Sequence, residues 1–252
     1  MSKIDLNCDM GESFGAWKTG NDFALMDFVS SVNIACGFHA GDATVIRKTV
    51  EKAVEKNIAV GAHPSFPDLQ GFGRREMKIS ETEIFDLVLY QVSAVKGICE
   101  AFGAKFRHVK PHGALYNQAA KDEKIAKAIT EAVKMIDKNL IFYGLSGSFL
   151  ISEAEKIGLK TASEVFADRT YQPDGSLTPR SLENALIEDA ETSLNQVLQM
   201  INSQTVTATN GEIVSIKAET VCIHGDGKNA LAFSEIINKK LTDAGISIES
   251  PK

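Results

Sequence analysis

Short extended segments and helical segments alternate along this chain, seven times over. A parallel connection between strands needs a crossover about as long as a helix, so this alternation predicts an α/β protein with a parallel sheet. The expected strands cover residues 4–9, 31–36, 58–63, 106–111, 140–145, 160–166 and 220–224. Two architectures fit this pattern, an open doubly wound sheet and a closed barrel.

Ionisable side chains gather where these strands end. They are Asp9, His39, His63, Lys110 with His112, Glu164 with Asp168, and His224 with Asp226. In an open sheet only the strands beside a switch point build a ligand site, whereas a closed barrel brings every strand end to one mouth. Because six strands, the first and last included, end in such groups, we predict a TIM-like (β/α) barrel with about seven parallel strands.

Local signals place the helices and one insertion. Asp42 is suited to cap a helix that continues to about residue 56, and Asp122 to cap another. Residues 80–83, Ser-Glu-Thr-Glu, form a capping box for a helix to about residue 102. Asn210-Gly211 lies between two runs of high β-propensity and predicts a small inserted β-hairpin near residues 205–216.

Length and composition narrow the functional classes. The chain has 252 residues and no linker-like stretch, so we expect one domain over residues 1–252. A net charge of −6 argues against nucleic acid and anionic membranes as partners, and no apolar run approaches a membrane span. The four cysteines form no CxxC pair and no secretory segment precedes them, so we expect reduced thiols in a cytoplasmic protein.

The stretch from Phe106 to Asn117 is the first candidate for a site. In an extended strand Phe106, His108, Lys110 and His112 lie on one face, and Pro111 should end the strand there. Three ionisable groups on one face of a buried strand are costly unless that face lines a wet cavity. The alternative is a strand whose polar face meets solvent.

A second candidate is the loop that follows the third strand. Residues 68–75 combine two glycines with Arg74 and Arg75. Such a loop suits a lid that grips an anion, and equally a solvated basic turn.

Several ordered motifs in this sequence resemble the LamB/YcsF family, the A subunit of bacterial 5-oxoprolinase, over essentially the whole chain. They are Asn7–Glu12, Asn33–Asp42, Gly61–Ser65, Gly71–Arg75, Lys110–Tyr116, Phe166–Arg169 and His224–Asp226. The chain departs from the family after Arg180, where Glu183-Asn184-Ala185 stands in place of the usual Gly-Ala pair.

This resemblance implies a seven-stranded barrel of the glycoside hydrolase/deacetylase type. It also implies an ATP-dependent opening of 5-oxo-L-proline to L-glutamate, performed with two further subunits. The chemistry then requires a proton-transfer group, a cation for developing charge and an arginine for the substrate carboxylate. The candidates are Asp9, His63 and His112 for proton transfer, Lys110 for charge, and Arg74, Arg75 or Arg169 for the carboxylate. Asn7, His39, Asp168, His224 and Asp226 are further substrate-binding candidates.

The nucleotide has no obvious site in this sequence. The chain lacks a GxxxxGK[ST] phosphate loop, since residues 225–228 match only a fragment of it. ATP, with Mg²⁺ as its counter-ion, is therefore expected to be shared with or held by the other subunits.

Two other functions stay open at this point. Asp9, His39 and His63 at adjacent strand ends could hold a metal ion, as in a metal-dependent amidohydrolase or deacetylase-like barrel. The chain could also be a non-catalytic subunit that binds the lactam and docks to an enzyme formed by its partners. Self-association also stays open.

Overall fold

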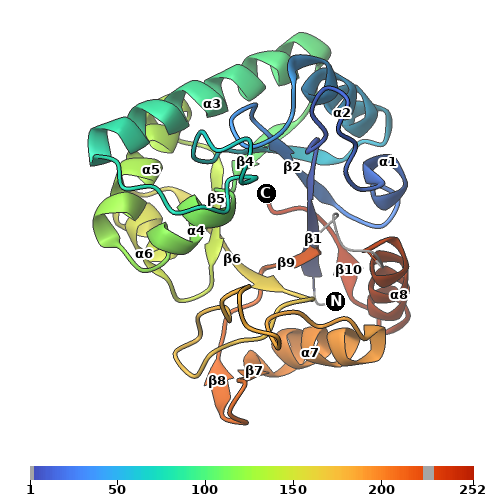
Figure 1. The fold of residues 1–252 in the computed structure, drawn as a ribbon. Helices are drawn as coiled ribbons and strands as arrows, with labels where there is room; N and C mark the ends of the chain where they lie inside the picture. Colours follow the sequence, from blue (N-terminus) through green and yellow to red (C-terminus); the bar gives the residue numbers. More distant parts are fainter. Residues whose placement is uncertain (1–2, 224–229) are drawn as a thin grey trace.

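The computed structural model describes residues 3–223 and 230–252. Seven parallel strands in these residues close into a barrel, in the order β1-β2-β3-β4-β5-β6-β9 with β9 paired to β1 (Figure 1). They are β1 (Lys3–Met10), β2 (Ser31–Ala35), β3 (Ala59–His63), β4 (Phe106–Val109), β5 (Ile141–Leu145), β6 (Lys160–Phe166) and β9 (Thr220–Ile223). The predicted TIM-like barrel of about seven strands is confirmed.

Helices surround this barrel (Figure 1). The longer ones are α2 (Ala43–Glu55), α3 (Glu81–Phe102), α5 (Glu123–Ile136), α6 (Phe149–Lys156), α7 (Ala190–Ser203) and α8 (Ala230–Asp243). The predicted caps are confirmed, because Asp42 and Asp122 accept backbone N–H groups of the first turns of α2 and α5, and Ser80 forms a capping box with Glu83. Two helices, α1 (Asp22–Leu25) and α4 (Gly113–Ala119), were not predicted, because they are too short for a helical period to stand out.

Two smaller strand pairs complete the fold. The predicted hairpin is confirmed as β7 (Thr205–Thr207) and β8 (Ile213–Ser215), which pair antiparallel. A two-residue strand, β10 (Ser247–Ile248), pairs with the start of β1 and was too short to predict. Within the described parts of the chain, no helix combines the length and apolar character that a membrane crossing requires.

Side chains along β1 alternate between the two faces of the barrel sheet, one toward the helices and the other toward the lumen. Ile4, Leu6, Cys8 and Met10 are buried in the hydrophobic core, which lies between the strands and the helices. The intervening Asp5, Asn7 and Asp9 are also buried, so β1 is a barrel strand and not an exposed edge. Their carboxyl and amide groups meet polar side chains of other strands across the lumen.

The lumen is a hydrogen-bonded polar layer. Such barrels are usually filled by branched aliphatic side chains. Here the buried side chains Ser31, Asn33, His108, Tyr143, Glu164 and Thr220 join those of β1. At the bottom, Asp5 accepts hydrogen bonds from the hydroxyls of Ser31, Thr220, Ser30 and Tyr143. Burial raises the pKa of the Asp5 carboxyl, and these four hydrogen bonds oppose that shift.

Gly61 on β3 provides the space that His108 occupies. A Cβ at Gly61 would fall on the imidazole ring of His108, which is fully buried and stacks on Tyr143 with ring centroids 4.1 Å apart. The register between β3 and β4 shifts at this glycine. The absence of a side chain at residue 61 therefore sets how deeply β4 places its lumenal groups.

We predict that Gly61→Ala lowers the free energy of unfolding by about 1–3 kcal/mol, because the new methyl group overpacks the lumen. Denaturant titration measures this. The matched control is Gly97→Ala in α3, where a Cβ meets nothing within 4 Å, and there we expect a gain of up to about 1 kcal/mol. Equal effects of the two substitutions would contradict the role given to Gly61.

Candidate active site

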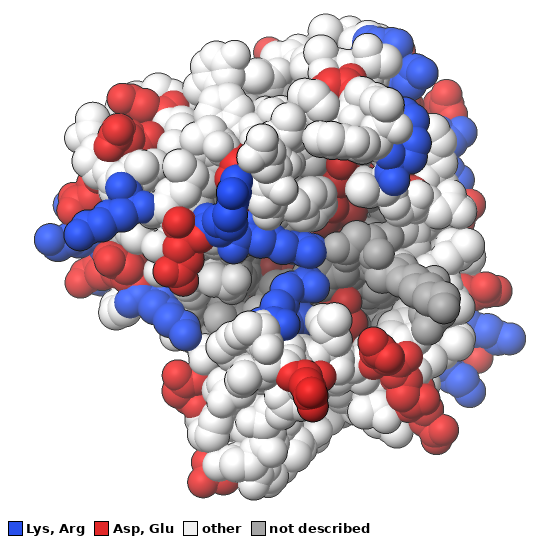
Figure 2. Space-filling model, viewed as in Figure 1, with Lys and Arg blue, Asp and Glu red and all other residues white. Residues whose placement is uncertain are grey.

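A cavity of about 690 Å³ opens at the carboxyl ends of the barrel strands. Its volume falls in the range of about 300–1,000 Å³ usual for small-molecule sites. Asp9, His63, Lys110 and His112 all line it, so the four residues expected to be catalytic do meet in one place. Figure 2 shows Lys and Arg side chains bordering the hollow at the centre of this face.

Asp9 stands at the end of β1 and connects the lumen to the cavity. Its Oδ1 accepts hydrogen bonds from Lys110 Nζ at 2.9 Å and from Asn33 Nδ2 at 2.8 Å. Its Oδ2 lies 3.2 Å from His63 Nε2. One oxygen is thus held by the barrel interior while the other faces the histidines of the mouth.

Lys110 is 2% exposed and lies between two carboxyl groups. Besides Asp9, its Nζ contacts Glu164 Oε1 at 2.8 Å and Cys222 Sγ at 3.0 Å. Burial is the largest influence on the pKa of Lys110 and lowers it, but the attraction of Asp9 and Glu164 outweighs burial, and the pKa lies well above its ordinary value. Burial also raises the pKa of the Cys222 thiol, so this partner of Lys110 is neutral.

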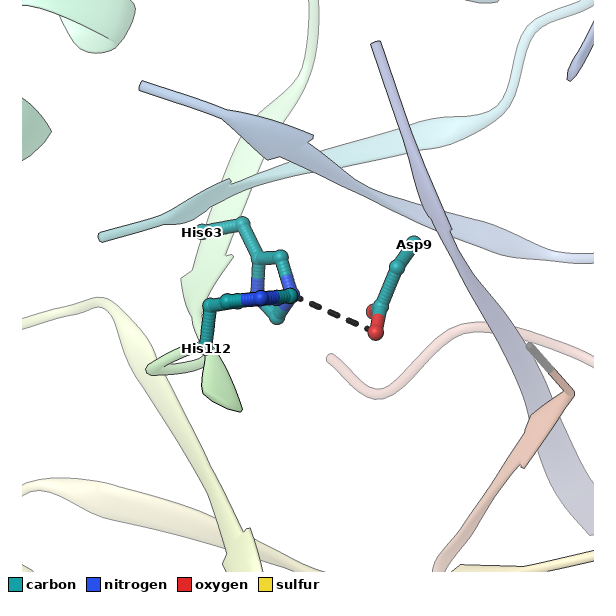
Figure 3. Close-up of side chains that lie close together, drawn as sticks. All are labelled: Asp9, His63 and His112. Atoms are coloured by element: carbon teal, nitrogen blue, oxygen red, sulfur yellow. Dashed lines mark hydrogen bonds and ion pairs between the residues drawn. The ribbon is translucent and has the colours of Figure 1, made fainter. Parts of the chain in front are cut away.

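Two histidines complete the inner end of the cavity (Figure 3). His63 Nδ1 lies 2.7 Å from the carbonyl oxygen of Lys110, and His112 Nε2 lies 2.8 Å from that of Phe72. Their other ring nitrogens, His63 Nε2 and His112 Nδ1, are 2.9 Å apart. Burial, with the neighbouring His39 and His63, lowers the pKa of His112 well below its ordinary range.

His39 and Glu12 form a second group beside the first. The ring of His39 stacks on that of His112, with centroids 3.9 Å apart. Glu12 Oε1 lies 3.5 Å from both His39 Nε2 and His112 Nδ1. The predicted metal ligands were Asp9, His39 and His63. The structure instead places His112 with Asp9 and His63, and His39 with Glu12 and His112. The reason is that β2 ends at Ala35, so a turn and not an extended strand delivers His39.

The loop of residues 68–75 separates its two arginines. Arg74 lines the cavity, with its guanidinium carbon 4.9 Å from the centroid of the Phe72 ring. Arg75 instead pairs with Asp68, and its side chain is 64% exposed. Asp68 also accepts the backbone N–H groups of Gly71 and Arg75, so the loop is anchored by its own hydrogen bonds. Of the two arginines, only Arg74 faces the candidate site.

The other predicted site residues differ in how they reach the cavity. Arg169 lines it, while its Nε and Nη2 donate to the carbonyl oxygens of Ala185 and Thr178, and burial lowers its pKa to about 10. Asp168, half-buried, is not among the described residues that line the cavity. His224 and Asp226 lie outside the described residues.

Asn7 lies below the cavity, and both its amide nitrogen and its amide oxygen form hydrogen bonds inside the barrel. Its Nδ2 donates to Glu164 Oε1 at 3.0 Å and to Thr220 Oγ1 at 2.7 Å. Its Oδ1 accepts from Asn33 Nδ2 at 2.7 Å and Lys110 Nζ at 3.3 Å. This bonding points to a role in positioning Glu164 and Lys110, and not to the predicted contact with substrate.

No role was predicted for Glu12, Tyr116 and Glu164. Tyr116, on α4, donates its hydroxyl to Glu164 Oε2 at 2.8 Å, and both Tyr116 and Glu12 line the cavity. The position of Glu164 near the end of β6 could have indicated that it belongs to the site. Tyr116 could not be placed because α4 was not predicted, and Glu12 lies in an irregular segment after β1.

Replacing Lys110 should destabilise the protein strongly. Lys110→Met leaves the carboxyl groups of Asp9 and Glu164 buried without their cation, and we expect a loss of about 3–5 kcal/mol in the free energy of unfolding. Denaturant titration at neutral pH measures it. The control is Arg107→Met, an exposed position on β4 three residues before Lys110, where a change within about 0.5 kcal/mol is expected. A Lys110→Met protein as stable as the parent would contradict this account of the lumen.

The chain is similar over its whole length to members of one protein family. The model of the LamB/YcsF family matches residues 4–252. The chain is 55% identical to a protein from Tolumonas auensis that is named as the A subunit of 5-oxoprolinase, with 99% of this chain and 100% of the relative aligned. It is 55% identical to the protein of the same name in Bacillus subtilis, with 98% of this chain and 96% of the relative aligned.

Among solved structures, a lactam utilization protein from Thermus thermophilus superimposes with a TM-score of 0.93 at 42% identity, covering 99% of this chain and 100% of that one. The catalytic domain of a peptidoglycan N-acetylglucosamine deacetylase from Eubacterium rectale gives a TM-score of 0.53 at 11% identity, covering 100% of this chain and 89% of that one. The second likeness concerns the fold alone.

Proposed function

Because the chain belongs to the LamB/YcsF family, we propose that it is the A subunit of an ATP-dependent 5-oxoprolinase, which opens 5-oxo-L-proline to L-glutamate together with two other subunits. The observation that carries this proposal is the full-length identity of about 55% to proteins of that name. A cytoplasmic location accords with the demand for ATP and with four cysteines that are all free and buried.

The reaction needs coupling to ATP because its substrate is a resonance-stabilised amide. Phosphorylation of the amide oxygen converts a poor electrophile into a good one. Water can then add to the ring carbon and lose a proton to a base, and the ring nitrogen takes up a proton as the C–N bond breaks, which leaves a γ-glutamyl phosphate. A second water hydrolyses this acyl phosphate to L-glutamate and inorganic phosphate. The chain must therefore offer proton-transfer groups beside a pocket that orients the lactam.

The inner end of the cavity supplies such groups. Asp9, His63 and His112 meet within hydrogen-bonding reach of one another, and all three line the cavity. Lys110 was expected to stabilise developing charge, but two carboxyl groups already neutralise its ammonium. We assign Lys110 to the positioning of Asp9, whose Oδ1 it holds at 2.9 Å.

Several cationic side chains line the cavity besides Lys110. They are Arg74, Lys121, Arg169 and Arg180, and the acidic residues Glu76 and Asp122 line it as well. Figure 2 shows Lys and Arg side chains beside the hollow. An anion such as the substrate carboxylate, or a phosphate brought by one of the other subunits, fits beside these cationic side chains. The lactam ring would then point inward, toward Asp9 and the two histidines.

Arg74 is the arginine that we assign to the substrate carboxylate. Arg74→Gln should raise the KM for 5-oxoproline roughly 10- to 150-fold in the assembled enzyme, because a charge-assisted hydrogen bond contributes about 1.5–3 kcal/mol. Steady-state kinetics at saturating ATP measures this. The adjacent Arg75→Gln is the control, with KM expected within about threefold of the parent because Arg75 faces Asp68. A larger rise in KM for the control would refute the assignment.

The proposal also predicts dependence on partners. We expect the purified chain to hydrolyse neither ATP nor 5-oxoproline at a useful rate, and ATP-dependent release of glutamate to appear only when the other two subunits are added. The test measures glutamate and ADP with each component omitted in turn. Full activity of the other two subunits without this chain would refute the proposed function. Rapid ADP release by the chain alone would refute its dependence on partners.

A further inference from the structure

The histidines at the inner end of the cavity have their tautomers set by backbone carbonyls. A carbonyl oxygen only accepts hydrogen bonds, so His63 Nδ1 and His112 Nε2 must carry the protons in their contacts with Lys110 and Phe72. In the neutral rings His63 Nε2 and His112 Nδ1 are then unprotonated. Two lone pairs face each other at 2.9 Å, and Asp9 Oδ2 lies 3.2 Å from the first of them.

This arrangement brings three acceptors together with no hydrogen between them. Lone pairs at such distances repel, and burial in a low-dielectric interior strengthens the repulsion. A cation among them, either a proton on one ring or a metal ion, removes the conflict. Among the residues that the structure describes, the carboxyl groups of Asp9, Glu12 and Glu164 share this region with the ammonium of Lys110, and the charge of these four groups favours a cation.

The distances from His63 Nε2 to its two neighbours fit a transition-metal ion. Metal–ligand bonds of about 2.0–2.2 Å place neighbouring ligand atoms about 3.0–3.5 Å apart in tetrahedral or octahedral geometry. The contacts of His63 Nε2 with His112 Nδ1 and with Asp9 Oδ2 measure 2.9 and 3.2 Å. Ligand atoms of all three residues lie within 4.8 Å of one another.

The groups behind these three residues also have the form that metal ligands require. A ligating histidine usually donates its outer ring N–H to a carbonyl or carboxylate, which fixes the ring and makes the inner nitrogen more basic. Both His63 and His112 do so here. Asp9 is held in the same manner, since Lys110 and Asn33 donate to its Oδ1 and leave Oδ2 directed at the histidines.

We propose that Asp9 Oδ2, His63 Nε2 and His112 Nδ1 form a binding site for a divalent transition-metal ion of the Zn²⁺ class. Two imidazoles and one carboxylate suit such ions, whereas Mg²⁺ prefers oxygen ligands, so this ion is distinct from the Mg²⁺ that accompanies ATP. Such an ion polarises a carbonyl or a bound water. Glu12 Oε1, 3.5 Å from His112 Nδ1, lies close enough to join the same site.

The proposal goes beyond the proposed function, because binding is measured on the chain alone without turnover. The chain is treated with a chelator, dialysed and titrated with Zn²⁺ by calorimetry, and Co²⁺ absorption spectra report the coordination. We expect one ion per chain, intense visible Co²⁺ bands, and no comparable binding of Mg²⁺. His63→Gln and His112→Gln should each weaken Zn²⁺ binding by roughly 100-fold or more.

The matched control is His108→Gln. His108 is buried, as His63 and His112 are, but it lies on β4 and outside the three-residue site. Its Nε2 bonds to Asn33 Oδ1 at 2.7 Å, so Zn²⁺ affinity should stay within about threefold. Circular dichroism confirms that each variant is folded, and Asp9→Asn replaces any histidine variant that is not. Equal Zn²⁺ affinity in the parent and the His63 and His112 variants overturns the proposal.

A proton on one of the two histidine rings would also remove the repulsion, and spectra can distinguish it from a metal ion. Nitrogen-15 spectra of the metal-free chain at neutral pH then show one of the two rings with both nitrogens protonated, and adding Zn²⁺ leaves those signals unchanged. That result overturns the metal site. If the assembled enzyme is fully active when built with such a metal-free chain, the proposed function stands and the metal ion is not needed for it.

Discussion

The pairing of Lys110 with Asp9 and Glu164 is the interaction on which the rest of this barrel depends. Three groups that would each be costly to bury alone meet within 2.9 Å contacts across the lumen, and they link β1, β6 and the end of β4. Removing the ammonium would leave two buried carboxyl groups facing each other. These three groups therefore fix the relative positions of strands that are far apart in the sequence.

Below Lys110, the lumen is held together by hydrogen bonds between neutral side chains. Asn7 connects Glu164, Thr220 and Asn33, and His108 bonds to Asn33 while stacking on Tyr143. Hydrogen bonds are directional, so a polar lumen specifies side-chain positions more strictly than an aliphatic filling would. The result is a rigid base for the groups at the mouth, which suits chemistry that depends on small differences in distance.

The mouth then combines two chemical regions. Carboxyl and imidazole groups converge at the inner end, and elsewhere four cationic side chains line the cavity together with Glu76 and Asp122. An amide ring that carries a carboxylate matches this division, with the ring inward and the carboxylate outward. The unprotonated nitrogens of His63 and His112 suit either proton transfer or a metal ion. In both cases the carbonyl contacts of the opposite ring nitrogens fix the tautomer of each ring.

The amino-acid sequence alone determined the barrel architecture, and it singled out Asp9, His63, Lys110 and His112, which the structure brings together at one cavity. The repeated alternation of strands and helices indicated a parallel sheet, and the ionisable residues expected at six strand ends favoured a ring that brings them together. Only the tertiary structure decided which of these residues meet. The turn after β2 carries His39 to Glu12, α4 begins at Gly113 just after His112, and the anchored loop turns Arg74 inward and Arg75 outward. These outcomes depend on turn conformations and on contacts between residues distant in the chain, which no periodicity in the sequence records.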